Sequence, residues 1–410
     1  MSTAPEHDGR PMSPDRDPAS SDAADQALLD EIFDRALAAI EERGDVTVDE
    51  LLAGIDRPDL RDRVLSMIDL AEQIAIATPA RRRPSGVGAY AILAELGHGG
   101  MGSVFLARRQ QGDGRYVALK VLPPAMGYSA RTRERFLAEA NALARLRHPH
   151  IVQVHEVVRD GRTLAYAMDH IDGVTLMGLV QGIVRRGGGD PDAAPPRPTI
   201  DDVARVLDVP AADVQRDGPV RSSDATLAYV AFVTRRVIDV AGALELAHSQ
   251  GLLHRDIKPA NILLSRASHA YLTDFGLMRD EDLDMTTMVG SEGGFAGTAA
   301  YASPEQLSGE TARIGTWSDV YSLGATLYHT LALRLPYAGP GPMQILLQVA
   351  RGQRVALHQA APWVPTELAS VVDRAMELDP RQRIATASEF AAELRVALSA
   401  ALATRSGAVG

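Results

Sequence analysis

Two short segments decide the fold, the octapeptide HRDIKPAN at residues 254–261 and the tetrapeptide TDFG that begins at Thr273. Three positions in them carry oxygen-bearing side chains of the kind that magnesium prefers, Asp256, Asn261 and Asp274. This pattern is typical of phosphoryl transfer, in which one carboxylate orients a hydroxyl and accepts its proton while the other carboxylate and the amide hold metal. Lys258, between the first carboxylate and the amide, would neutralise the moving phosphoryl group.

Lysine is almost absent from this chain. Of its 42 lysine and arginine residues, only two are lysines, Lys120 and Lys258. Arginine can replace lysine on a solvated surface, but it fails where the chemistry needs a compact ammonium group on a flexible stem. Both lysines are therefore candidates for function.

A glycine-rich run lies between two strands predicted over residues 91–96 and 103–108. It comprises Leu96, Gly97, His98, Gly99, Gly100, Met101, Gly102, Ser103 and Val104. Backbone N–H groups in such a turn can approach phosphates closely. The turn joins two strands rather than a strand and a helix. It therefore favours a flap that covers nucleotide phosphates, and it disfavours a dinucleotide-binding motif. Taken alone, the run also fits an ordinary hairpin turn.

The next predicted strand, over residues 116–122, places Ala118 and Lys120 on the same face. A lysine at this position can reach the α- and β-phosphates under the flap. Since a buried lysine needs a counter-charge, we expect Glu139 to supply it from the apolar face of a helix predicted over residues 132–146. A solvated glutamate at the edge of that helix is the alternative.

The chain divides into five predicted segments, and strands precede helices in the longest of them. These segments are a disordered arm at 1–21, a helical unit at 22–78, a linker at 79–89, a catalytic domain at 90–399 and a tail at 400–410. Strands followed by helices indicate an α+β domain with a small β-rich lobe and a larger helical lobe. A glycine- and proline-rich insertion at 185–223, with one short helix predicted over 200–207, reads as a surface insertion or as a docking or regulatory loop.

Between residues 90 and 399 the chain resembles the protein kinase family, and within it the bacterial serine/threonine kinases of eukaryotic type. The glycine-rich loop, strand lysine, catalytic loop, Asp-Phe-Gly and a segment close to Ala-Pro-Glu occur in the family's order. The resemblance implies a two-lobed protein kinase fold, with one helix in the N-lobe, after a small all-α unit. It also implies transfer of the γ-phosphoryl group of ATP, with Mg²⁺ or alternatively Mn²⁺, to Ser/Thr hydroxyls of protein substrates.

The resemblance also implies a role for each matching residue. The catalytic set is Asp256, Lys258, Lys120, Glu139 and Thr298. The metal ligands are Asn261 and Asp274. The ATP-binding set adds the run Leu96–Val104, Ala118, Met168 as guard of the adenine pocket, and the main chain of Asp169 and Ile171.

Further positions would support and regulate this site. By the same resemblance, Glu305 and Arg383 form a buried ion pair, and Asp319 holds the backbone of the catalytic loop. Ser303 departs from the family's Ala-Pro-Glu, and we expect little effect because serine is small. Arg255 precedes the catalytic aspartate, which suggests that autophosphorylation orders the activation loop, the segment between Asp274 and Glu305. The candidate acceptors are Thr286, Thr287 and Ser291.

Two other functions stay open at this point. A pseudokinase scaffold predicts loss of Lys120, Asp256 or Asp274, yet all three are present. A small-molecule phosphotransferase of the same ancestral fold is disfavoured by residues 297–305, which resemble a platform for an extended peptide. A partner could dock on the helical unit 22–78 or on the insertion 185–223.

Composition excludes several classes of function and partner. The net charge is −11 and no long segment is basic, so we expect no nucleic-acid partner. With no cysteine, the chain has neither disulfides nor thiolate metal sites. No apolar run reaches about 18 residues, so we expect no membrane span, and without a signal peptide we expect a cytoplasmic location.

Overall fold

The computed structural model places most of the chain and divides it into two compact units. One unit is built from residues 1–85 and 123–128, the other from residues 86–122 and 129–410. The residues described are 28–29, 31–32, 35–36, 48–52, 55, 57–77, 85–99, 102–110, 112, 114–122, 130–161, 163–188, 195–214, 224–275, 299–309, 313–337, 339 and 341–406. The arm predicted over 1–21 lies outside them.

The first unit is helical in its described residues. Helix α2 spans Val48–Leu51 and helix α3 spans Pro58–Ala77, the latter as the apolar periodicity predicted. Proline suits the first position of α3, where its missing N–H has no partner to lose. Leu60, Val64 and Ile68 recur every four residues along α3 and are buried in the unit's core.

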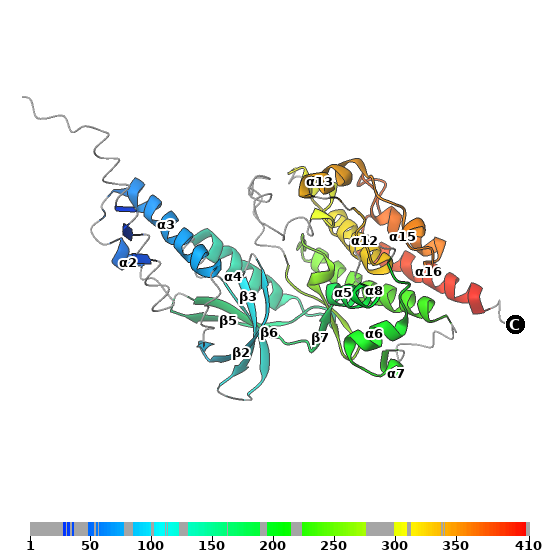
Figure 1. The fold of residues 1–410 in the computed structure, drawn as a ribbon, viewed down its shortest axis with the longest axis horizontal. Helices are drawn as coiled ribbons and strands as arrows, with labels where there is room; N and C mark the ends of the chain where they lie inside the picture. Colours follow the sequence, from blue (N-terminus) through cyan, green and yellow to red (C-terminus); the bar gives the residue numbers. More distant parts are fainter. Residues whose placement is uncertain are drawn as a thin grey trace, which may run out of the picture. The chain divides into compact units, whose positions relative to one another are not determined.

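The N-lobe of the second unit is a six-stranded antiparallel sheet with the order β1-β2-β3-β4-β6-β5 and one helix, α4 (Figure 1). The elements are β1 (Gly86–Val87), β2 (Tyr90–Gly99), β3 (Gly102–Arg109), β4 (Tyr116–Val121), α4 (Ala130–Arg145), β5 (Val154–Asp160) and β6 (Thr163–Asp169). Strand β1 lies in the stretch expected to be linker, because Gly86 and Val87 pair with Ala91 and Tyr90.

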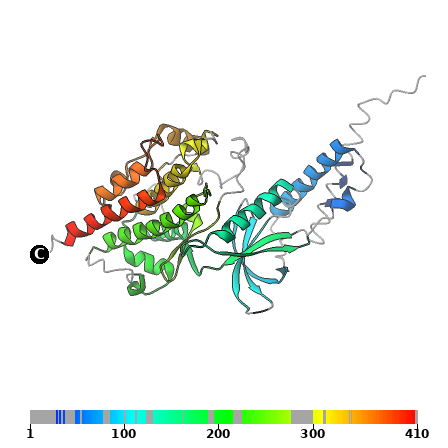
Figure 2. The ribbon, with the colours of Figure 1, turned by 180° about the vertical axis from the view of Figure 1, so that it is seen from behind.

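The C-lobe is helical apart from a small sheet, β7-β8-β9, and the two lobes together form the predicted kinase architecture (Figure 2). Its strands are β7 (Gly173–Thr175), β8 (Ile262–Ser265) and β9 (Ala270–Leu272). Its helices are α5 (Leu176–Arg186), α6 (Ile200–Leu207), α7 (Ala211–Val214), α8 (Ala225–Ser249), η2 (Pro259–Asn261), α11 (Pro304–Leu307), α12 (Thr316–Ala332), α13 (Pro342–Arg351), α14 (Leu357–Ala360), α15 (Thr366–Ala375) and α16 (Ala387–Ser406).

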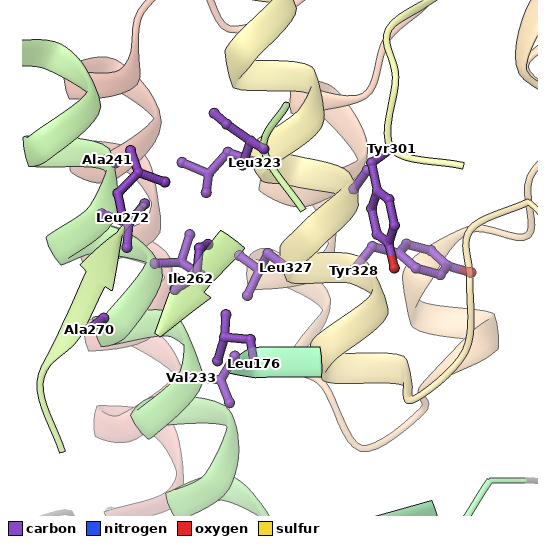
Figure 3. Packing of buried hydrophobic residues seen from close by; sticks show 14 of the residues in the cluster. Leu176, Val233, Ala241, Ile262, Ala270, Leu272, Tyr301, Leu323, Leu327 and Tyr328 are labelled. Carbon is purple, nitrogen blue, oxygen red and sulfur yellow. The ribbon is translucent and has the colours of Figure 1, made fainter. Parts of the chain in front are cut away.

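Two helices, α8 and α12, form the centre of the C-lobe. Every residue of α12 from Ser318 to Ala332 is buried, and α8 is buried on most of its circumference. Helices that are apolar all round occur inside a domain rather than on its surface. Figure 3 shows Leu327 of α12 beside Ile262 of β8 and Leu176 of α5. Because the small sheet packs on this rigid pair, the loops that flank its strands are held in place.

The insertion predicted as a surface loop contributes in part to the core. Helix α6 has the predicted bounds, and its Ile200, Val203 and Leu207 are fully buried. Asp202 caps the helix by accepting from the N–H of Thr199 at 2.8 Å and pairs with Arg186 of α5. The prediction of a surface insertion is therefore wrong for α6, because the strongly apolar face of this helix packs against α5 and α8.

The last helix passes through the boundary expected at residue 400. Helix α16 continues to Ser406, and Ala401 is buried. Among the helices described here, none is both long enough and apolar enough to span a membrane.

Candidate active site

The strand lysine lies in a buried cluster of charges. Strand β4 pairs with β3 and β6 and carries Lys120 inward, where only 5% of the residue is exposed. Its Nζ is 2.8 Å from Asp274 Oδ1 and 3.5 Å from Glu139 Oε1. Glu139 comes from α4 and is fully buried. The predicted Lys120–Glu139 pair is present, and Asp274 is the nearer of the two carboxylates.

Burial and charge act against each other in this cluster. Burial alone lowers the pKa of Lys120, but Asp274, Tyr166 and Glu139 together raise it well above its usual value. Burial also acts on Asp274, where it favours the neutral acid. The charge of Lys120 outweighs this effect and lowers the pKa of Asp274. At Glu139 burial prevails, so its pKa is raised despite the lysine. Lys120 and Asp274 are therefore a charged pair in the folded protein.

Tyr166 belongs to this cluster, although it was not among the predicted site residues. It lies on β6, is fully buried and donates from its hydroxyl to Glu139 Oε1 at 3.1 Å. Lys120 Nζ is 5.7 Å from the centre of its ring. Alternation along β6 places Tyr166 on the same face as Met168, a residue already chosen for the adenine pocket, and that signal would have found it.

The catalytic loop brings its three predicted residues together. Lys258 Nζ is 3.0 Å from Asp256 Oδ2. Asn261 Nδ2 donates to the same Oδ2 at 3.1 Å and to the Asp256 carbonyl at 2.8 Å. The Asp256 carboxylate is thus held by two donors and kept in one orientation.

A buried aspartate on α12 fixes the backbone of this loop, as predicted. Asp319 accepts from the main-chain N–H of His254 and of Arg255, both at 2.8 Å, and lies 2.8 Å from His248 Nε2. Arg255 has a φ of 62°, a region that side chains other than glycine rarely adopt. The Asp319 carboxylate stabilises this conformation through Arg255's own N–H, at the residue before Asp256.

His254 joins the loop to the Asp274 segment, and sequence reasoning assigned it no role. Its Nε2 is 3.0 Å from the carbonyl of Thr273, and its ring centre is 4.4 Å from that of Phe275. Burial lowers the pKa of His254, so the ring is neutral at physiological pH. These contacts on both sides of Asp274 place its carboxylate, whose side chain is 31% exposed, beside Lys120.

The nucleotide-binding residues of the N-lobe lie on neighbouring strands. Val104 pairs with Lys120 across β3 and β4, and Ala118 pairs with Met168 across β4 and β6. The N–H of Asp169 donates to the Gln153 carbonyl at 3.0 Å, so this N–H is already used within the protein. Ile171 is half-buried against the core.

In the glycine-rich run, β2 extends through Gly97 and His98 to Gly99, and β3 begins at Gly102. Gly102 has a φ of 129°, where a side chain would be strained. His98 Nδ1 lies 2.8 Å from Ser103 Oγ across the hairpin, and Leu96 is 48% exposed. Gly100 and Met101, between these strands, lie outside the described residues.

The predicted anchor of the C-lobe is a two-point ion pair. Arg383 contacts Glu305 Oε1 at 2.7 Å and Oε2 at 3.3 Å. Ser303 is the N-cap residue before α11 and donates from its hydroxyl to Gln306 Oε1, while Gln306 Nε2 donates to the Arg255 carbonyl at 3.0 Å. Serine at this position therefore caps a helix that reaches the catalytic loop.

Besides Gly100 and Met101, four further predicted residues lie outside the described part of the chain, Thr286, Thr287, Ser291 and Thr298. Their assignments stay predictions.

The donor set fits a divalent cation bound together with a polyphosphate. Asp274 and Asn261 offer hard oxygen ligands, and Lys120 lies beside Asp274. Within the described residues no group of three or more acidic, histidine or cysteine side chains could hold a metal alone. Magnesium commonly takes only one or two carboxylates and completes its coordination with substrate phosphates and water. The site thus suits a metal that arrives with a nucleotide.

Curated relatives match most of this chain. Serine/threonine-protein kinase pkn2 of Myxococcus xanthus is 32% identical over 318 residues, 76% of this chain and 33% of the relative. PknB of Mycolicibacterium smegmatis is 32% identical over 73% of this chain and 41% of its own length. The chain therefore spans less than half the length of these relatives.

A solved structure has the same fold. The crystal structure of the Mycobacterium tuberculosis PknI kinase domain matches with a TM-score of 0.51 and 28% identity, over 77% of this chain and 99% of that chain. A family model described as protein tyrosine and serine/threonine kinase matches residues 90–393. The chain belongs to the protein kinase family.

Proposed function

We propose that this chain is a serine/threonine protein kinase that transfers the γ-phosphoryl group of Mg-ATP to hydroxyl groups of proteins. One observation supports the proposal. Lys120 pairs with Asp274 and Lys258 pairs with Asp256, and hydrogen bonds of Thr273 to Asn261 and to His254 join the two segments that carry these pairs. Members of the family use ATP and a divalent metal. Magnesium is the metal we favour, with manganese as the alternative.

Each residue contributes by position or charge. ATP supplies the phosphoryl group, with Lys120 placed to bind its phosphates and Asn261 and Asp274 to hold the metal. Asp256 orients the acceptor hydroxyl and takes its proton, while Lys258 offsets negative charge near the transferred group. Thr298 would join Asp256 and Lys258 once an acceptor binds. The partners of these groups fix their charges in advance, and such preorganised charge is how electrostatic catalysis gains its effect.

The decisive test is the Asp256→Asn variant. Asparagine keeps the shape and can still accept from Lys258, but it is a poor proton acceptor. We expect phosphate transfer from labelled ATP to a generic basic protein to fall about 10²–10⁴-fold. Phosphoamino-acid analysis of the product should give phosphoserine or phosphothreonine. Equal transfer by variant and parent would contradict the assignment.

Two other functions are less well supported. A pseudokinase scaffold would not need all three of Lys120, Asp256 and Asp274, and each of them has partners here. A small-molecule phosphotransferase would not need residues 297–305 as a peptide platform. Transfer to a small metabolite pool but not to a basic protein would favour it.

Regulation by autophosphorylation at Thr286 or Thr287 is part of the proposal. A phosphate there could pair with Arg255 and order the segment before the peptide platform. Mapping phosphosites after incubation with Mg-ATP tests this. Phosphate found only outside residues 276–298 would contradict it.

The helical unit 22–78 is proposed as a docking module for a protein partner, with the five predicted segments as working boundaries. Comparing the full chain with a chain that begins at Ser85 separates an inhibitory from a neutral unit. A nucleic-acid partner is not part of the proposal, and the cytoplasmic location stays a prediction.

A further inference from the structure

The peptide group that joins Arg255 to Asp256 is held at both of its polar atoms. Its carbonyl oxygen accepts from Gln306 Nε2 at 3.0 Å. Its N–H donates to His254 Nδ1 at 3.3 Å, so the proton of that ring lies on Nε2, which donates to the Thr273 carbonyl at 3.0 Å. Because a peptide group is planar, these two bonds fix its tilt and limit the direction in which the Asp256 side chain leaves the main chain.

Ser303 determines which end of the Gln306 side-chain amide faces the catalytic loop. The main-chain N–H of Ser303 donates to Gln306 Oε1 at 2.9 Å, and its hydroxyl donates to the same oxygen at 3.1 Å. A main-chain N–H only donates, so it meets the oxygen of the amide and not the nitrogen. The amide nitrogen is thereby turned toward the Arg255 carbonyl. Ser303 is fully buried, and this one oxygen satisfies both of its donors.

The residue beside Gln306 is bonded to the helix that holds the other side of Arg255. Glu305, the neighbour of Gln306 on α11, accepts from Ser318 Oγ at 2.7 Å. Ser318 is in turn the neighbour of Asp319 on α12, whose carboxylate accepts from the Arg255 N–H at 2.8 Å. Gln306 and Asp319 therefore hold Arg255 from two segments that a hydrogen bond joins directly.

A capping role alone does not explain why residue 306 is glutamine. In the capping box at the start of α11, the Gln306 side chain only has to accept from Ser303, and a glutamate performs that task equally well. A carboxylate near a helix N-terminus also gains from the helix dipole. A carboxylate has no donor, however, so glutamine but not glutamate can bond to the Arg255 carbonyl. The bond to the catalytic loop, and not the cap, requires glutamine.

We propose that Gln306, oriented by Ser303, is a positioning residue for Asp256. By holding the Arg255 carbonyl, it keeps the Asp256 carboxylate where an acceptor hydroxyl meets it, a geometry on which the rate of group transfer depends steeply. The inference rests on the proposed kinase activity, and it gives a role in that activity to two residues outside the predicted catalytic set.

The test compares the full-length parent with Gln306→Glu, which keeps the cap and loses the donor. We expect kcat for phosphate transfer from ATP to a generic basic protein to fall about tenfold, while the KM for ATP changes less than about twofold. The midpoint of denaturant unfolding should not fall, because the cap is intact. Ser303→Ala removes one of the two donors that orient the amide, and its kcat should lie between those of the parent and Gln306→Glu.

Two further variants separate the lost donor from the added charge. Gln306→Met lacks the donor and adds no charge, and its kcat should also fall. Gln359→Glu adds the same charge at an exposed position elsewhere in the C-lobe, and its kcat should equal that of the parent. A loss of kcat in Gln306→Glu that is absent from Gln306→Met would overturn the proposal, because charge alone would then explain it.

Hydrogen exchange gives a readout that does not require activity. In Gln306→Glu the Asp256 N–H should exchange about tenfold faster, at single-amide resolution by mass spectrometry, while the amides of α12 exchange as in the parent. An unchanged kcat, or a loss of kcat that follows a lower unfolding midpoint, would overturn the proposal. A parent that transfers no phosphate would instead contradict the proposed function, and the exchange rates would still decide whether Gln306 fixes the loop.

Discussion

Two buried ion pairs of this protein differ in how completely they use their hydrogen-bonding groups. In the C-lobe anchor, Arg383 contacts both oxygens of Glu305, and Ser318 donates to Oε1 at 2.7 Å. In the N-lobe, Lys120 is 3.5 Å from Glu139 and 2.8 Å from Asp274. Among the described residues, Glu139 Oε2 has no hydrogen-bond partner.

The pKa values of the two glutamates move in opposite directions. Burial favours the neutral acid at both, but Arg383 outweighs burial at Glu305 and lowers its pKa. At Glu139 burial outweighs Lys120 and raises the pKa. A fully paired charge stabilises a fold, whereas an incompletely paired cluster leaves its lysine able to share its charge with a bound phosphate. We infer that the first pair is structural and the second functional.

Removing the cation from each pair gives the largest expected effects. Arg383→Met leaves Glu305 buried without its partner, and we expect the free energy of unfolding to fall by about 3–5 kcal/mol. Denaturant unfolding measures it. A loss below about 1 kcal/mol would contradict the structural reading, because that is the range of exposed pairs.

The matching change in the N-lobe is Lys120→Met. Burial raises the pKa of Glu139, so without the lysine this carboxyl takes up a proton more readily than Glu305 does, and we expect a clearly smaller loss of stability than for Arg383→Met. Phosphate transfer should instead fall about 10²–10³-fold, as when one preorganised donor is removed. The comparison fails if Lys120→Met unfolds the protein as strongly as Arg383→Met does.

The pH dependence of stability should differ in sign between the two pairs. The lowered pKa of Glu305 means that its stabilising contribution is present above the usual glutamate pKa, near 4.3, and is lost as the pH falls. The raised pKa of Glu139 means that its contribution declines as the pH rises through that region.

Denaturant unfolding of the parent, Glu305→Gln and Glu139→Gln across a pH series isolates each carboxyl. The difference in free energy of unfolding between the parent and Glu305→Gln should shrink toward low pH. The corresponding difference between the parent and Glu139→Gln should shrink toward high pH. Slopes of the same sign for both would show that the two pairs do not differ as described.

The smallest expected effect comes from one hydroxyl. Tyr166→Phe removes the donor to Glu139, and we expect a loss of about 1 kcal/mol in stability with a higher KM for ATP. Tyr229→Phe is the control, because its hydroxyl donates to the Thr330 carbonyl at 2.6 Å, in the C-lobe core. An unchanged KM for ATP in both variants would show that the Tyr166 hydroxyl does not contribute to the site.

Several features were predictable because their signals are local in the sequence. The spacing within residues 254–261 and the scarcity of lysine identified Asp256, Lys258 and Lys120. Apolar periodicity predicted α6 at residues 200–207 and the end of α3 near Ala77. Such motifs and helical periodicities involve residues close together in the chain, so they can be recognised from one sequence.

Other features depend on packing between distant segments. Lys120 and Asp274 are 154 residues apart, and no local pattern predicts that this carboxylate lies nearer the lysine than Glu139 does. The hydroxyl of Tyr166, the burial of α6 and the pairing of β1 with β2 likewise follow from the tertiary fold. Residue type and spacing were enough to predict which groups are candidates for the chemistry. Which of these groups touch became clear from the folded structure, because burial and pairing depend on how the lobes and helices pack.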